Sequence, residues 1–185
     1  YSDEWVVEAE KRGLPNIKSM IEAASTLTSE KAVALFEKFG IYTKAELESR
    51  EEIIYETYAK TINIEALTMI DMAGKQIIPA VVKYTKTLAD TANAIKAAGG
   101  DASVQTELLA DVSTKLAAMQ KELNKLVADE KEASAMEDVK AQAFFYKDTI
   151  KATMDELRKP ADELEMIVDK DVWPIPTYGE LMFEV

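Results

Sequence analysis

The chain lacks cysteine and histidine altogether. Without thiols it can form neither a disulfide framework nor a thiolate metal site, which fits a reducing compartment. Without imidazole it lacks the side chain most often used for acid–base catalysis near neutral pH. The same absence excludes the Glu-x-x-His ligand pairs of the di-iron enzymes that are built on long-helix bundles.

Glycine and positive charge are also scarce. None of the 6 glycines belongs to a Gly-rich loop that would cradle phosphate. Lys and Arg number 22 against 34 for Asp and Glu, and the formal net charge of −12 disfavours nucleic acid and anionic membranes as partners. No run approaches the roughly 18 apolar residues of a membrane span, and no stretch resembles a secretion signal. We therefore expect a cytoplasmic protein.

Three short helices are predicted over residues 1–42. Acidic residues at the start of the first and Gly13 after it place that helix near residues 3–12. The second is expected over residues 17–25. Thr28 or Ser29 caps the third, which Gly40 closes.

Long helices follow from Thr43, where Glu46 completes a capping box. Gly99-Gly100 is the first hairpin turn, and the loss of apolar periodicity places the second turn within residues 128–135. Pro79 and Pro160 are expected to kink or mildly interrupt the first and last helices, which otherwise continue to Gly99 and to about Asp169. The stripes that should face the core comprise Leu47, Ile54, Tyr58, Ile62, Met69, Ile77, Tyr84, Leu88 and Ile95, then Leu108, Val112, Leu116, Met119, Leu123 and Leu126, then Val139, Ala143, Tyr146, Ile150, Leu157, Leu164 and Ile167.

Three long helices joined by short turns must be antiparallel neighbours. The predicted fold is therefore all-α, a long antiparallel helical bundle with two Pro-kinked helices. Residues 1–42 form a short-helix preamble, residues 43–170 the bundle, and residues 171–185 an extended aromatic tail.

The C-terminal tail is too apolar to be a solvated terminus. Pro174 and Pro176 remove two backbone donors, so extended backbone is expected there. Such a segment needs a surface, either the end of its own helices or a domain beyond these residues. The residues predicted to dock are Trp173, Pro174, Pro176, Tyr178, Leu181 and Phe183.

Two carboxylates lie in the most apolar stretch, residues 61–73. Glu65 and Asp71 could be metal ligands or general acids, but a structural role is favoured, because buried charges persist only when paired. Their candidate partners are Arg50, Lys60, Lys75 or a neighbouring domain.

An acidic cluster near residues 129–138 lacks the pattern of a calcium loop, so we interpret it as a solvated face. Its members are Asp129, Glu130, Glu132, Glu137 and Asp138. No nucleophile has a base beside it in the sequence pattern, and no metal-ligand set is complete. The chain by itself is not expected to be an enzyme, nor to hold a cofactor.

Three segments together resemble the C-terminal region of type III glutamine synthetases. They are residues 8–16 (EAEKRGLPN), residues 61–66 (TINIEA) with residues 78–80 (IPA) after them, and residues 173–183 (WPIPTYGELMF). Their order and approximate spacing also match, so the resemblance spans the whole chain. The terminal string is the most specific of the three.

The resemblance implies a C-terminal helical piece of an ATP-dependent ligase that makes glutamine from glutamate and ammonia. The family's ammonia, glutamate, ATP and Mg or Mn sites belong to β-grasp and catalytic domains, which are expected upstream of Tyr1. It also implies a large homo-oligomer for the parent, a dodecamer, with the upstream catalytic domain and neighbouring subunits as partners. No residue of this chain matches the family's catalytic motifs.

Two functions follow for comparison. The first is a non-catalytic structural or oligomerisation domain of such a glutamine synthetase. The alternative is a free-standing helical scaffold or adaptor that binds partner helices. The alternative explains the apolar stripes but not the tail or the absence of an initiator Met.

Overall fold

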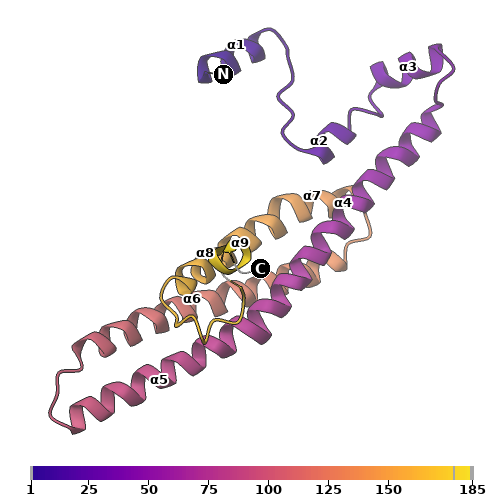
Figure 1. Ribbon diagram of the computed structural model, residues 1–185. Coiled ribbons are helices and arrows are strands. Elements are labelled where there is room, and N and C mark those ends of the chain that lie inside the picture. The colour runs from indigo at the N-terminus through magenta and orange to yellow at the C-terminus, as the bar shows by residue number, and fades with distance from the viewer. Residues whose placement is uncertain (1, 177, 184–185) are drawn as a thin grey trace. The chain divides into compact units, whose positions relative to one another are not determined.

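The structure is a computed structural model that describes residues 2–176 and 178–183, without the side chain of Tyr178. The described residues form helices and no strand (Figure 1). They divide into two compact units. Unit 1 holds the chain up to Thr61 together with Met136–Phe144, and unit 2 holds Ile62–Ala135 and the chain from Phe145 onward.

Unit 1 begins with three short helices, as predicted. Ser19 and Ser29 are N-caps whose hydroxyls accept hydrogen bonds from the backbone of Glu22 and Ala32, both at 3.3 Å. The helices of this unit are α1 (Asp3–Lys11), α2 (Met20–Ala24), α3 (Glu30–Lys38), the first part of α4 (Lys44–Met72) and most of α7 (Val139–Phe145).

The predicted capping box opens α4. The backbone N–H of Thr43 donates to Glu46 Oε2 at 2.7 Å, and the backbone N–H of Glu46 donates to Thr43 Oγ1 at 3.3 Å. The bond from the Thr43 backbone lowers the pKa of Glu46. The start of the first long helix is therefore confirmed.

The core of unit 1 joins segments that are distant in sequence. Ile21, Ala24, Tyr55 and Ala143 are buried together. The rings of Tyr55 and Phe144 pack with centroids 6.2 Å apart. The division of the chain thus differs from the predicted boundary at residue 43, because α2, α4 and α7 bury their apolar faces against one another.

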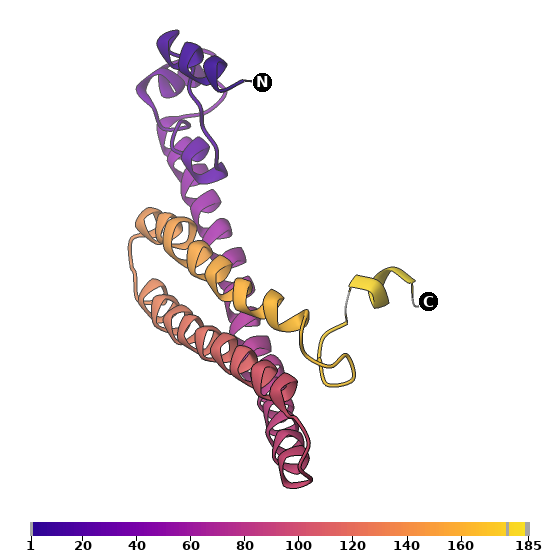
Figure 2. The ribbon, with the colours of Figure 1, turned by 90° about the vertical axis from the view of Figure 1, so that its left-hand side faces the viewer.

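Unit 2 is an antiparallel helical bundle. In both ribbon views α5 (Ile78–Ala97) and α6 (Ser103–Ser134) run side by side in opposite directions, joined by a short turn (Figures 1 and 2). Gly99 has a φ of 79° in that turn, a left-handed conformation that favours glycine. Helix α6 also packs along α8 (Lys151–Glu165). The all-α antiparallel fold is confirmed.

The predicted apolar stripes face inward in each unit. Every residue of the three stripes is buried or half-buried. In α6, Val112, Met119 and Leu126 have no exposed surface, and Leu164 of α8 is equally enclosed. Burial of this kind contributes about 1.5–3 kcal/mol for each large aliphatic side chain, so these seams are the main source of stability.

The second interhelical turn lies later than predicted. Helix α6 continues to Ser134, and residues 135–138 make the turn. Residues 128–134 remain helical because this last part of α6 is also packed. Ala133 is fully buried there, and Asp129 Oδ2 accepts a 2.7 Å hydrogen bond from Thr153. The last helix ends at Glu165 rather than near Asp169.

The two prolines act differently. Directly before Pro79 the chain forms a π-helical turn, η1 (Ala73–Ile77), in which the N–H of Ile78 bonds to the carbonyl of Ala73. This wider turn accommodates the missing proline donor, so an irregularity lies where it was predicted. The predicted interruption at Pro160 is wrong, because α8 passes through it unbroken. A second π-helical turn, η2 (Tyr146–Ile150), lies far from any proline.

Candidate functional site

A tight turn after α8 directs the C-terminal tail. The side chain of Asp169 accepts a 2.9 Å hydrogen bond from the backbone of Asp171, and its carbonyl accepts bonds from Val172 at 2.9 Å and Trp173 at 3.0 Å. Asp side chains commonly organise turns in this way. After this turn the side chain of Trp173 is half-buried within unit 2.

The tail forms one wall of an apolar groove in unit 2. The groove encloses about 560 Å³, within the range of roughly 300–1,000 Å³ that is usual for ligand sites. Its other walls come from α4, η1, α6 and α8. The lining residues are Ile64, Glu65, Thr68, Met69, Met72, Ala73, Ile77, Met119, Met154, Leu157, Arg158, Ala161, Asp162, Glu165, Trp173, Ile175, Pro176 and Leu181.

The residues predicted to dock fall into two groups. Trp173, Pro176 and Leu181 line the groove. Pro174 and Phe183 do not line it, and Phe183 is 79% exposed. The side chain of Tyr178 lies outside the described residues.

The expectation that the whole tail is extended is wrong. Residues Tyr178–Phe183 form a short helix, α9. Pro174 and Pro176 restrict their own backbone and that of the preceding residue, and both lie before this helix. Nothing in residues 178–183 therefore prevents helical backbone.

An ion pair ties α9 to the start of the tail. Lys170 Nζ lies 3.1 Å from Glu180 Oε1, and the two side chains are 61% and 26% exposed. A pair this exposed stabilises the structure by no more than about 1 kcal/mol. This weak ion pair and apolar contact therefore hold the described part of the tail.

Four methionines give the groove a soft apolar lining. Met69 and Met72 project from α4, Met119 from α6 and Met154 from α8. Unbranched thioether side chains adapt to ligands of different shape. The groove suits apolar binding and offers no nucleophile with a paired base.

The rim of the groove is acidic. Glu65, Asp162 and Glu165 contribute three carboxylates, against the single guanidinium of Arg158. Arg158 Nε lies 3.1 Å from Asp162 Oδ2. The carboxylates of Glu65 and Glu165 therefore leave an excess of negative charge at the rim.

The prediction of buried ion pairs at Glu65, Asp71 and Arg50 is wrong, because all three residues are exposed. Asp71 pairs with Lys75, one of its predicted partners, across one turn on the surface. Arg50 stacks 4.3 Å from the centre of the Tyr42 ring instead. Helix α4 is apolar on several sides in this stretch, yet Ile64 and Leu67 are themselves 66% and 47% exposed.

No group of three or more carboxylates among the described residues is arranged to hold a metal ion. Members of the acidic cluster have structural partners instead. Glu130 accepts a hydrogen bond from Ser134 at 2.5 Å, and Asp138 Oδ1 accepts one from the backbone of Ala141 at 2.6 Å. Asp138 therefore caps the start of α7.

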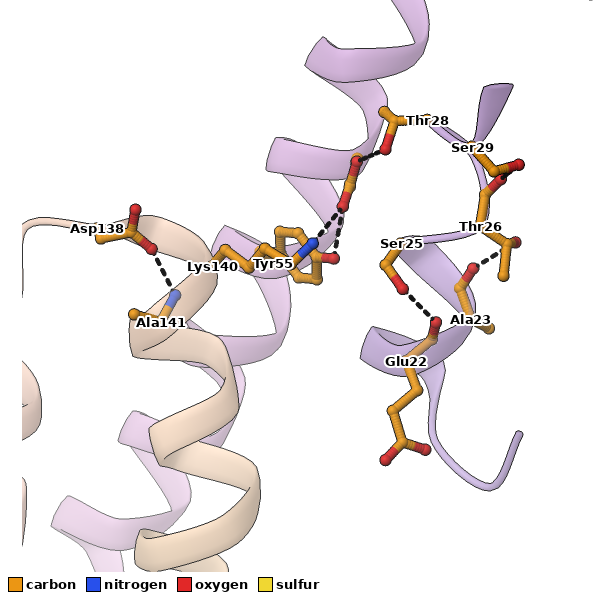
Figure 3. A network of polar contacts seen from close by, with 11 residues as sticks. Glu22, Ala23, Ser25, Thr26, Thr28, Ser29, Tyr55, Asp138, Lys140 and Ala141 are labelled. Carbon is orange, nitrogen blue, oxygen red and sulfur yellow. Dashed lines mark hydrogen bonds and ion pairs between the residues drawn. The ribbon is translucent and has the colours of Figure 1, made fainter. Parts of the chain in front are cut away.

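A second site, which is polar, lies in unit 1, and Figure 3 shows Thr28, Tyr55 and Lys140 converging there. Thr28 Oγ1 donates to Glu51 Oε2 at 2.6 Å, and Tyr55 Oη donates to Glu51 Oε1 at 2.6 Å. Lys140 Nζ from α7 lies 3.3 Å from the same Oε1 atom. Three segments of the chain therefore converge on one carboxylate.

Burial and hydrogen bonding set the pKa values of this site. Burial opposes ionisation of Glu51, but the hydrogen bonds from Thr28, Tyr55 and Lys140 outweigh it and hold the pKa of Glu51 below its ordinary value. Burial, and then the Glu51 carboxylate, raise the pKa of Tyr55. Burial lowers the pKa of Lys140, but contacts with Glu51 and Tyr55 raise it more. The site is a stable ionised pair rather than a proton donor.

Sequence patterns do not single out Glu51 or Lys140, and they indicate Thr28 only as a candidate helix cap. Glu51 and Tyr55 are four residues apart on one helix, which is a usable local signal. The partners Thr28 and Lys140 lie 23 and 89 residues away from Glu51, so only the fold brings them together. The groove as a site is likewise not predicted by the sequence, although Glu65 and the tail residues that line it are singled out there.

No helix among the described residues combines the length and the apolar character that crossing a membrane requires.

Comparison with known proteins identifies the family. A family model described as glutamine synthetase C-terminal domain matches residues 1–96. The chain is 40% identical to a glutamine synthetase of Butyrivibrio fibrisolvens, covering 100% of this chain and 27% of that protein. It is 33% identical to the type-3 glutamine synthetase of Dictyostelium discoideum, covering 99% of this chain and 26% of that protein. A glutamine synthetase of Bacteroides fragilis is 30% identical, with the same two coverages.

The chain thus spans about a quarter of the length of the curated relatives it matches. The similarity extends over nearly all of its residues, including the groove and the tail. The chain belongs to the glutamine synthetase C-terminal domain family, with a type-3 enzyme among its relatives.

Proposed function

We propose that the chain is a non-catalytic structural domain of a type III glutamine synthetase, which braces the catalytic body or mediates contacts between subunits. The observation that carries this proposal is the family match combined with a span of about a quarter of the relatives. The two described sites agree with it. One is an apolar groove and the other is a fully paired carboxylate, and neither has the groups of an active site.

The parent protein would carry the chemistry. Its ATP, its Mg or Mn, and its glutamate and ammonia sites would lie in a catalytic domain upstream of this chain. Its neighbouring subunits would form a large homo-oligomer, a dodecamer. The tail would pin the bundle to that assembly through side chains such as Phe183 and Met182, which are 79% and 70% exposed in this chain.

Assays on the purified chain test the absence of catalysis. We expect helical circular dichroism, no glutamine formation, and no saturable binding of Mg-ATP. Ligase activity from the purified chain would contradict the proposal. The matched positive control is the longer parent protein in the same assay.

A substitution in the parent protein tests the structural role. Trp173→Ala should weaken assembly or thermal stability more than substrate binding, because Trp173 holds the tail against the bundle. Trp5→Ala is the matched control, since Trp5 is 49% exposed and lies in α1. A selective rise in the KM for glutamate with an intact oligomer would argue for a role at the active site.

A further inference from the structure

We propose that the groove of unit 2 is a docking site for a short amphipathic helix that has an apolar face and a basic flank. The groove has an apolar floor and an acidic rim, and part of its wall is a weakly held tail. These three features together specify the chemistry of the partner.

The apolar side chains that line the groove favour the apolar face of a partner helix. Met69, Met72, Met119 and Met154 line the groove together with Leu157, which is almost fully buried. Methionine-rich grooves accept the anchors of amphipathic helices, because thioether side chains repack around them. A volume of about 560 Å³ has room for more than one large side chain.

The carboxylates at the rim of the groove determine which charge the partner helix should carry. Glu65 and Glu165 form no ion pair in the part of the chain that the structure describes, whereas Asp162 already pairs with Arg158. The whole chain carries a formal net charge of −12. An acidic helix would be repelled by this rim, while Lys or Arg beside the apolar anchors would complement it.

The chain's own tail offers no positive charge to the carboxylates at the rim of the groove. Residues 171–183 contain Asp171 and Glu180 but no Lys or Arg. The tail instead contributes apolar wall, through Trp173 and Leu181. The Lys170–Glu180 ion pair is exposed, so it adds no more than about 1 kcal/mol to the cost of moving the tail aside to admit a helix.

Tryptophan fluorescence reports occupancy directly. The chain has 2 Trp residues, so Trp5→Phe leaves Trp173 at the groove as the sole reporter. The probes are two helical peptides of about 15 residues with the same leucine face, one carrying lysines and the other glutamates. Each is titrated into the 185-residue chain, and circular dichroism checks that every variant keeps its helical content.

We expect saturable one-to-one binding of the lysine peptide, about tenfold tighter than that of the glutamate peptide and weaker at high salt. The double variant Glu65→Lys/Glu165→Lys should lose this preference. Glu107→Lys/Glu132→Lys is the matched control, because both residues are exposed and without an ion pair among the described residues, and it should bind as the unsubstituted chain does. Ala161→Phe, which fills the groove without adding a second Trp beside Trp173, should block both peptides.

Three results would overturn the proposal. The first is tight binding of the lysine peptide to the Glu65→Lys/Glu165→Lys variant, which would mean general attraction to an acidic chain. The second is equal binding of both peptides, which would mean an apolar slot without charge selection. The third is a Trp173 signal with a small apolar dye but not with either peptide, which would mean a pocket for small molecules only.

Discussion

Glu51 and Lys140 lie 89 residues apart in the sequence, and their charged groups are 3.3 Å apart in unit 1. The same Glu51 carboxylate accepts hydrogen bonds from Thr28 and Tyr55. It therefore joins the segment before α3, helix α4 and helix α7. The Glu51 side chain is 9% exposed and that of Lys140 is 53% exposed, so the carboxylate is the member that depends most on its partners.

Replacing Glu51 should destabilise unit 1. In Glu51→Gln the ionic component is lost and the hydroxyls of Thr28 and Tyr55 face a weaker acceptor, while Lys140 regains water. We expect a loss of about 1–2 kcal/mol in the free energy of unfolding, measured by urea denaturation followed by circular dichroism. Glu52→Gln, at an exposed neighbouring position, should change it by less than about 0.5 kcal/mol. Equal losses in the two variants would mean that the Glu51 contacts contribute nothing specific.

The same carboxylate predicts a pH dependence. The folded-state pKa of Glu51 lies below its ordinary value of 4.5, so its contribution is present above that value and is lost as the pH falls through the folded-state pKa. Between neutral pH and the acid range, the free energy of unfolding should therefore fall more steeply for the unsubstituted 185-residue chain than for Glu51→Gln. Parallel curves for the two proteins would contradict the lowered pKa.

The Lys170–Glu180 ion pair should affect α9 locally and contribute little to global stability. Lys170→Glu places two negative charges together at the Lys170–Glu180 contact, so hydrogen exchange in α9 should become faster while global stability falls by less than about 1 kcal/mol. The charge-swapped double variant Lys170→Glu/Glu180→Lys should recover the slower exchange. Exchange in α9 that is unchanged in Lys170→Glu would show that apolar contacts alone hold the tail.

The seam of the bundle should carry most of the stability. Leu126 has no exposed surface, whereas its neighbour Val127 is 45% exposed. Leu126→Ala should lower the free energy of unfolding by about 2–5 kcal/mol through lost burial and a residual cavity. Val127→Ala is the control, with an expected change of under about 0.5 kcal/mol. Similar losses at both positions would contradict the inward orientation of this stripe.

Local signals explain which elements were predictable. The capping box at Thr43 and Glu46 and the turn at Gly99 depend on residues within one helical turn of each other, and both were predicted from the sequence. The apolar stripes have the same local origin, because the helical repeat alone decides which side chains share a face. Their inward orientation follows once any partner helix is available.

Sequence patterns that depend on tertiary packing lead to wrong predictions. The loss of periodicity after Ala128 indicated a turn, yet packing of Ala133 and the bond from Thr153 to Asp129 keep that segment helical. Two prolines in the tail indicated extended backbone, but they say nothing about residues 178–183, which form α9. The apolar neighbours of Glu65 and Asp71 predict burial, yet those neighbours include exposed side chains.

The sequence by itself determined an all-α chain with antiparallel long helices, an apolar C-terminal tail and no conventional catalytic set, because composition and the helical repeat are properties of short stretches. Only the tertiary structure decided that Thr28, Tyr55 and Lys140 meet at Glu51, and that the tail closes an apolar groove with an acidic rim. Such sites are made by residues from several helices. Their formation depends on which faces pack together, and the order of residues along one helix does not contain that information.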